Sequence, residues 1–115
     1  MFLGLRTVIY PAPDLAASKA WYSALLGVEP YFDEPFYVGF DVGGYELGLH
    51  PETDAAETYW GVEDVEAAHA ALLAAGATER SPVTDVGEGI RVATVLEPAG
   101  SVLGIIHNPH FRGGG

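Results

Sequence analysis

Two segments of the chain carry the hydrophobic pattern of a capped helix. The first runs from Asp14 to Gly27, where an aspartate suits an N-cap and a glycine suits a left-handed C-cap. The second runs from Asp64 to Gly76 and repeats this plan around an alanine-rich interior. The apolar face of the first helix is expected to comprise Leu15, Tyr22, Leu25 and Leu26. The pattern therefore predicts two helices of the same design, one in each half of the chain.

The remainder of the chain is typical of strands, because β-branched and aromatic residues recur between glycines and prolines. One candidate strand precedes each helix and three follow it. In the first half these strands are Leu3–Tyr10, Val28–Asp33, Phe36–Val42 and Tyr45–His50. In the second half they are Thr58–Glu63, Thr78–Val83, Ile90–Leu96 and Val102–His107. A βαβββ unit thus occurs twice, and we expect one domain over residues 1–115 with module one at 1–51, a linker at 52–57 and module two at 58–111.

The turns before the two final strands are also alike. They read Val42-Gly-Gly44 in one half and Pro98-Ala-Gly100 in the other, followed by Leu47-Gly-Leu-His-Pro51 and Leu103-Gly-Ile-Ile-His-Asn-Pro109. With the order of strands and helices, these stretches make the chain similar to the vicinal oxygen chelate superfamily, which groups glyoxalases, bleomycin-resistance proteins and extradiol dioxygenases. The resemblance covers nearly the whole chain.

The resemblance implies an α+β fold in which two βαβββ modules form a half-open, barrel-like curved sheet, with the helices outside, a ligand in the cup inside, and often a homodimer. It also implies four positions at which relatives hold a divalent metal. In this chain they fall on Thr7, Gly48, Glu57 and Gly104. A hydroxyl, a carboxylate and two glycines cannot supply the roughly three protein ligands of a catalytic metal, so we expect no metal cofactor, with a divalent metal as the alternative. The two glycines are expected to leave room for a bulky ligand.

Charge and composition limit the classes of molecule that this protein is expected to bind. Sixteen acidic against five basic residues give a net charge of −11, which disfavours nucleic acid and anionic membranes and favours a cationic guest. The chain has no cysteine, which excludes disulfides and thiolate chemistry. No apolar run is long enough to span a bilayer and no targeting segment is visible, so a cytoplasmic protein is expected.

Strand alternation places Glu46 and His50 on the same face as Gly48. A carboxylate and an imidazole there could act as general acid and base or could bind a polar group of a ligand, while His50 could equally be a solvated strand end. His50 with Glu57 is a further candidate pair of metal ligands. By the same alternation, His107 stands three residues after Gly104 and is expected to point away from the cup.

Aromatic side chains crowd the predicted first sheet, and such side chains make stacking surfaces for planar or cationic ligands. Arg91 is a rare basic residue in an interior strand, where it could pair with a carboxylate or anchor an anionic ligand group. The candidate ligand-binding residues are Tyr37, Phe40, Glu46, Gly48, His50, Tyr59, Arg91 and Gly104.

Two functions of different classes fit these residues. The first is metal-free binding of a small cationic or aromatic molecule, as in the drug-sequestering members of the resembled family. The second is a lyase, isomerase or dioxygenase that uses a metal or the acid–base pair of His50 and Glu46. The sequence leaves open which of them holds, and leaves the roles of His107 and His110 open as well.

Overall fold

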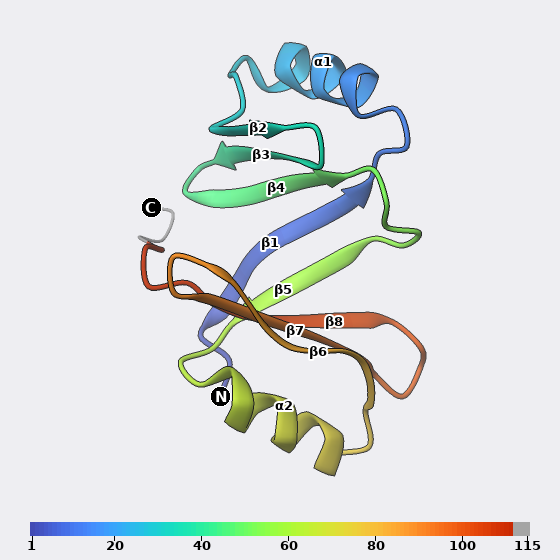
Figure 1. Cartoon of the computed structure of the whole chain (residues 1–115), viewed down its shortest axis with the longest axis vertical. Coiled ribbons are helices and arrows are strands. Elements are labelled where there is room, and N and C mark those ends of the chain that lie inside the picture. Colours follow the sequence, from blue (N-terminus) through green and yellow to red (C-terminus); the bar gives the residue numbers. More distant parts are fainter. Residues whose placement is uncertain (112–115) are drawn as a thin grey trace. The chain divides into compact units, whose positions relative to one another are not determined.

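The computed structural model describes residues 1–111, which form two compact units (Figure 1). We call residues 7–56 the first module, and residues 1–6 together with residues 57–111 the second module. The first six residues thus pack with the second module, although they belong to the first repeat in sequence. Each module is described by itself.

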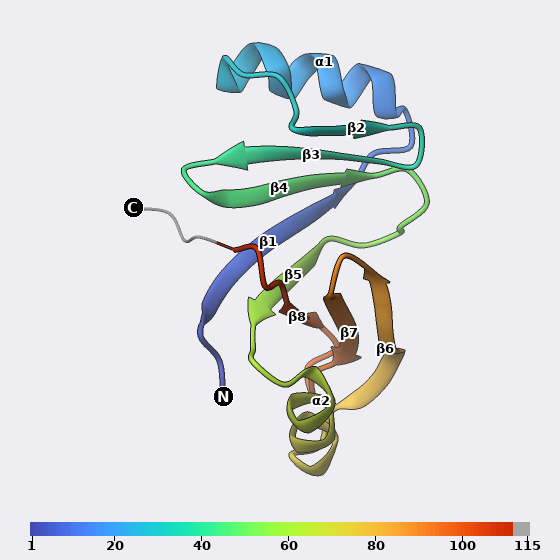
Figure 2. The ribbon, with the colours of Figure 1, turned by 60° about the vertical axis from the view of Figure 1, so that its left-hand side comes forward.

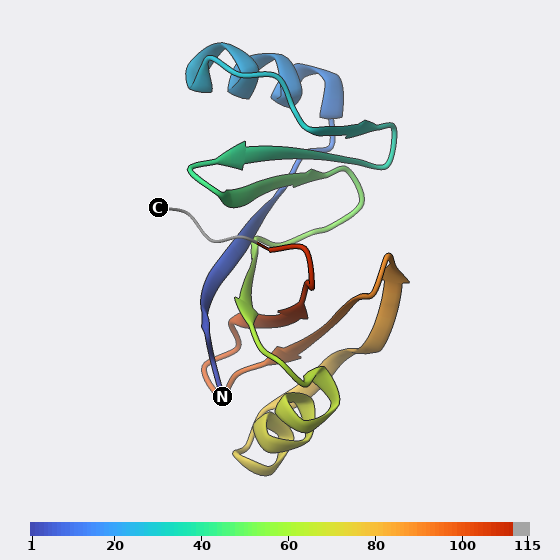
Figure 3. The ribbon, with the colours of Figure 1, turned by 90° about the vertical axis from the view of Figure 1, so that its left-hand side faces the viewer.

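The first module contains one helix and four strands. They are β1 (Gly4–Pro11), α1 (Leu15–Leu26), β2 (Phe32–Glu34), β3 (Tyr37–Val42) and β4 (Tyr45–His50), with β1 entering from the second module at its first three residues. The strand order is β2-β3-β4-β1, in which β1 and β4 are parallel and the other neighbours antiparallel. The helix α1 packs against β3 and β4. Figures 1 and 3 show the helix beside this module's strands, at the top of each view.

The second module repeats this arrangement. Its elements are β5 (Glu57–Gly61), α2 (Val65–Ala74), β6 (Thr78–Gly87), β7 (Ile90–Leu96) and β8 (Val102–His107). The order is β5-β8-β7-β6, again with the first and last strands of the module parallel. The helix α2 packs against β6, β7 and β8 (Figure 2). The α+β class and the paired βαβββ modules are confirmed.

Both helices begin as the sequence predicts. The side chains of Asp14 and Asp64 each accept a hydrogen bond from the backbone N–H three residues later. Gly27 ends α1 in the left-handed conformation with φ of 72°. At the end of α2 the cap is Ala75, and the left-handed glycine, Gly76, follows it.

Two strands differ from their predicted bounds by four residues at one end. Strand β2 begins at Phe32, four residues later than expected, because Pro30 lacks the N–H that an earlier start would need. Strand β6 continues to Gly87 past Pro82, through register shifts along an outer strand of the module's sheet, where a proline is tolerated.

Each module buries its core between the sheet and the helix. In the first module the core gathers Ala12, Val38, Phe40, Leu47 and Leu49, against which Leu15, Tyr22 and Leu26 of α1 pack. The predicted apolar face of α1 therefore holds except at Leu25, which is 63% exposed. In the second module the core gathers Val62, Val65, Ala68, Ala93 and Ile105. The opposite face of each sheet, which we call the helix-free face, carries the polar residues discussed next.

No helix in residues 1–111 is both long and apolar enough to cross a membrane.

Candidate functional site

The helix-free face of the first module centres on the carboxylate of Glu46. The parallel register places Glu46 of β4 beside Thr7 of β1, and the Thr7 hydroxyl donates to Glu46 Oε1 at 3.2 Å. The hydroxyl of Tyr31 donates to the other oxygen, Oε2. Both groups fit because Gly39 lies beneath them, where a Cβ would come within 2.8 Å of Glu46 Oε2. Among the described residues, this half-buried carboxylate contacts two hydroxyls and no basic side chain.

The surroundings of Tyr31 keep its hydroxyl in the donor form. Burial of the hydroxyl raises the pKa of Tyr31 well above its usual value, and the hydrogen bond to Glu46 and the charges of Glu46 and Asp41 raise it further. The hydrogen bond therefore runs from a neutral phenol to an ionised carboxylate.

Next to this carboxylate the tyrosine ring of Tyr37 covers Gly48. A Cβ on Gly48 would lie 2.0 Å from the Tyr37 hydroxyl oxygen. The ring meets His50 edge-on with centroids 6.3 Å apart, and it also meets Phe32 with centroids 6.0 Å apart. The room expected above Gly48 is thus filled by the protein's own side chain, and the result is an aromatic surface beside Glu46.

The imidazole of His50 is engaged at the end of β4. Its Nδ1 accepts a hydrogen bond from the backbone N–H of Glu52 at 3.0 Å, so the neutral ring carries its proton on Nε2. The described contacts of His50 and Glu46 do not join them, although the two share a face. The predicted acid–base pair is therefore not assembled in this structure.

Phe40 does not belong to this face. It is fully buried in the core on the helix side of β3, because residues alternate along the strand and Gly39 takes the helix-free position. The prediction of Phe40 as a ligand-binding residue is wrong for this reason.

The helix-free face of the second module also centres on a carboxylate, that of Glu57 on β5, which is 8% exposed. Arg80 Nη1 lies 2.9 Å from Glu57 Oε2, and the Tyr59 hydroxyl donates to Oε1 at 3.0 Å. Arg80 Nη1 also approaches the Thr94 hydroxyl at 3.4 Å, and Thr94 is 2.6 Å from Ser81 Oγ. In contrast to Glu46, Glu57 has a cationic partner.

The ring of Tyr59 covers Gly104 as Tyr37 covers Gly48. A Cβ on Gly104 would lie 2.6 Å from Tyr59 Cδ2 and 2.8 Å from the backbone oxygen of Thr58. Tyr59 faces the same side as Glu57, as predicted, but the room over Gly104 is again filled from within the chain.

Arg91 lies on the other face of this module's sheet, where its guanidinium pairs with Glu66 of α2. The predicted pairing with a carboxylate is confirmed, and a role for Arg91 as a ligand contact on the helix-free face does not fit. His107 is also turned to the helix side, with Nδ1 3.3 Å from the backbone oxygen of Val62. His110 Nε2 approaches the backbone oxygen of Glu88 at 2.9 Å.

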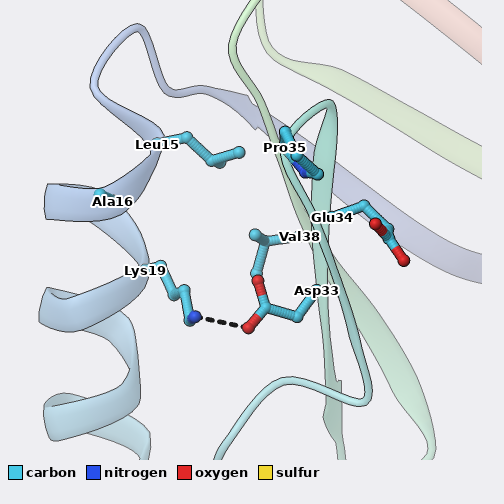
Figure 4. A pocket seen from close by; sticks show the side chains of 7 residues that line it. All are labelled: Leu15, Ala16, Lys19, Asp33, Glu34, Pro35 and Val38. Atoms are coloured by element: carbon cyan, nitrogen blue, oxygen red, sulfur yellow. Dashed lines mark ion pairs between the residues drawn. The ribbon is translucent and has the colours of Figure 1, made fainter.

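A separate cleft lies between α1 and the β2–β3 hairpin of the first module (Figure 4). It has a volume of about 400 Å³, and an ion pair between Lys19 and Asp33 crosses its opening. Leu15 and Val38 line it, and both belong to the helix side of the sheet. It therefore shares nothing with the carboxylate site.

Comparison with known proteins places this fold. The family model described as Glyoxalase/Bleomycin resistance protein/Dioxygenase superfamily matches residues 4–105. The chain belongs to this superfamily. No curated protein sequence matches the chain.

Solved structures of the superfamily share the fold at low identity. A variant of Streptomyces coelicolor methylmalonyl-CoA epimerase, in complex with 2-nitronate-propionyl-CoA, superposes with a TM-score of 0.77 over 98% of this chain and 99% of that one, at 16% identity. The Mn(II)-bound glyoxalase from Novosphingobium aromaticivorans gives 0.73 at 22% identity over 92% of this chain and 39% of that one. A superfamily member from Vibrio splendidus 12B01 gives 0.68 at 18% identity over 90% and 97% of the two chains.

The superfamily's divalent metal does not fit the residues at its four positions in this chain. Thr7 is a hydroxyl engaged with Glu46, and Gly48 and Gly104 offer no donor and are covered by tyrosines. Glu57 alone is a carboxylate, and Arg80 and Tyr59 occupy its oxygens. No group of three or more histidine, cysteine, aspartate or glutamate residues comes together within residues 1–111. The second predicted pair, His50 and Glu57, is divided between the two modules.

Among the residues that sequence reasoning missed are Tyr31 and Arg80, which contact the two carboxylates. Tyr31 precedes the strand that carries its neighbours, and nothing in its spacing points to Glu46. Arg80 could have been found, because it is one of only five basic residues and lies two residues after Thr78, on the same face of a predicted strand. A basic side chain in a sheet of such an acidic protein calls for a buried carboxylate partner.

Proposed function

We propose that this superfamily member binds a small cationic molecule, with an aromatic group, on the helix-free face of its first module and without a metal ion. The observation that carries the proposal is the Glu46 carboxylate, held by the hydroxyls of Thr7 and Tyr31 and contacted by no basic side chain among the described residues. A half-buried carboxylate in such a setting is stabilised by a cation from outside.

The aromatic surface supports the same class of ligand. Tyr37 lies over Gly48 and contacts the rings of Phe32 and His50, and together these rings form an aromatic surface beside the negative charge. Aromatic faces attract cations and stack on planar groups. The net charge of −11 adds a long-range attraction for cations.

Binding is tested with matched small probes. Benzylamine, which is protonated at neutral pH, and benzyltrimethylammonium serve as cations, and benzyl alcohol serves as the neutral counterpart. NMR shift titration of the first module's amides gives the dissociation constants. We expect the cations to bind at least roughly tenfold more tightly than the alcohol, and the preference to weaken with salt.

The variant Glu46→Gln removes the charge and keeps the shape of the side chain. We expect it to weaken cation binding by roughly tenfold or more, the effect of losing a charged partner. Glu29→Gln is the control, because it makes the same change of net charge at an exposed residue of the same module. Equal binding of the alcohol and the cations, or equal losses in the two variants, would contradict the proposal.

The same carboxylate supports a second candidate, an acid–base isomerase. Glu46 would abstract a proton from the carbon next to a carbonyl group of the substrate, while the Tyr31 hydroxyl donates a hydrogen bond to the Glu46 carboxylate. The fold shared with an epimerase whose complex holds a CoA ester gives a substrate class to try. Proton exchange of CoA thioesters in deuterated water, followed by NMR and lost in Glu46→Gln, would favour this candidate over binding alone.

We also propose a homodimer. The apolar side chains of Trp21 and Leu25 project from α1 with 60% and 63% exposure, and Val28 after the helix is 44% exposed. Exposed apolar groups of this size are typical of interfaces. Light scattering should give twice the chain mass of 12.1 kDa, and a mass of one chain would contradict the homodimer.

A further inference from the structure

The second module supplies a cationic partner for its own carboxylate, because Arg80 pairs with Glu57. Arg80 lies on its helix-free face with 27% of the side chain exposed, and its Nη1 lies 2.9 Å from Oε2 of Glu57, whose side chain is only 10% exposed. A guanidinium suits this place because it is always charged and its planar fork matches a carboxylate.

The contacts around the pair hold both partners. Tyr59 donates to the remaining oxygen of Glu57, and Thr94, which is 2% exposed, lies beside Arg80 Nη1. The Ser81 hydroxyl is hydrogen-bonded to the Thr94 hydroxyl and also accepts a hydrogen bond from the Thr94 backbone N–H. The hydroxyls thus form a polar lining around the charged pair, as a buried ion pair requires.

Glu57 stands at one of the four positions where the superfamily holds a metal ion, and it is the carboxylate among them. A metal at this position would have to displace Arg80 from the Glu57 carboxylate and find further donors. Gly104, the other position in this module, offers none and is covered by Tyr59.

We infer that Arg80 is the resident counter-ion of Glu57 and takes the place of a metal ion in the second module. The position is closed to divalent cations by a side chain of the chain itself. This inference does not depend on ligand binding at Glu46, because it concerns other residues in the other module and is read out by stability and metal binding.

The first experiment is chemical rescue. Arg80→Ala removes the guanidinium and leaves space for a soluble one, and we expect its Tm to fall by about 10 °C. Methylguanidinium at low millimolar concentration should raise the Tm of this variant by several degrees, because a ligand that binds only the folded state stabilises it. Equal concentrations of sodium chloride should not raise it.

Two controls make the rescue specific. Arg91→Ala removes an arginine whose partner Glu66 is exposed, so we expect a Tm loss below about 5 °C and no rescue. The double variant Glu57→Gln/Arg80→Ala lacks the carboxylate and should be more stable than Arg80→Ala but insensitive to methylguanidinium. Rescue of the double variant, or none of Arg80→Ala, would overturn the inference.

The second experiment uses the unaltered chain. After treatment with a chelator it is titrated with Mn²⁺, Ni²⁺ and Zn²⁺ by calorimetry, and we expect no saturable binding. One equivalent of metal whose binding is lost in Glu57→Gln would overturn the inference. If Arg80→Ala does not fold while the double variant does, the need of Glu57 for a cation is supported; if neither folds, Arg80 serves packing and the inference is wrong.

Discussion

The two modules share a fold and a carboxylate but differ in what neutralises that carboxylate. In the first module Glu46 accepts from Thr7 and Tyr31, which are both uncharged. In the second module Glu57 is paired with Arg80 and also accepts from Tyr59. Repetition of one βαβββ plan has therefore produced one face with an unbalanced charge and one whose charge is balanced internally.

This difference shows why the fold alone does not assign a function. The same strands and the same glycine positions support either arrangement, and a few side chains decide which of them forms. In our proposal the first module receives a cation from outside, while the second module supplies its own cation, Arg80.

The largest expected effect is a difference in the free energy of unfolding between variants of the two carboxylates. Glu57→Gln leaves Arg80 facing a neutral amide, and we expect a loss of about 3 kcal/mol in the free energy of unfolding. Glu46→Gln removes only acceptors for hydroxyls, and we expect a loss of about 1 kcal/mol. Urea unfolding of both variants measures the difference. Equal losses would show that the two carboxylates are held alike and would break the comparison.

A smaller effect tests the tyrosines that cover the glycines. Gly48→Ala and Gly104→Ala each force a methyl group into a ring, and we expect losses of about 2 kcal/mol.

Shortening the ring should distinguish the two sites. Tyr37→Leu is expected to remove most of the cost of Gly48→Ala, whose three nearest atoms all belong to Tyr37. Tyr59→Leu should relieve Gly104→Ala only in part, because the backbone oxygen of Thr58 still lies 2.8 Å from the new methyl group. Double-mutant cycles in urea give the two coupling energies, and similar relief at both sites would contradict this reading.

The smallest effect concerns alkaline pH. The pKa of Tyr31 is raised in the folded state, so above about pH 10 the unfolded chain loses this proton while the folded chain keeps it. Stability should therefore fall with pH in that range, and Tyr31→Phe should reduce the slope. The effect is small because Tyr31 as a whole is 64% exposed. Unfolding free energies between pH 9 and pH 11 measure it, and an unchanged slope would exclude Tyr31 as the cause.

The fold could be predicted from the sequence because its signals are local and repeated. Asp14 and Gly27 bound one helix, and Asp64 begins the other. The alternation in β4 placed Glu46 and Gly48 on one face as observed. These features depend on neighbours in sequence, which a pattern can show.

The partners across strands could not be predicted in the same way. Arg80 reaches Glu57 over 23 positions, and Tyr31 reaches Glu46 over 15, so each pairing depends on register and rotamer. Phe40 is an exception, because it stands three residues after Tyr37 and the alternation along β3 could have placed it on the helix side, where it is buried. The glycines were expected to leave space, and only the side chains of Tyr37 and Tyr59 show that it is filled.

The first six residues have a consequence for dividing the chain. Leu3 donates its backbone N–H to Gly61, Phe2 packs against Trp60, and Arg6 lies over the ring of Phe111 at 4.0 Å. A fragment that begins at Glu57 would lose these contacts, and the edge of β5 and the ring of Phe111 would be left uncovered. We therefore expect a circular permutant, opened in the linker at 52–57 and joined at the original termini, to preserve the second module better than expression of that half alone.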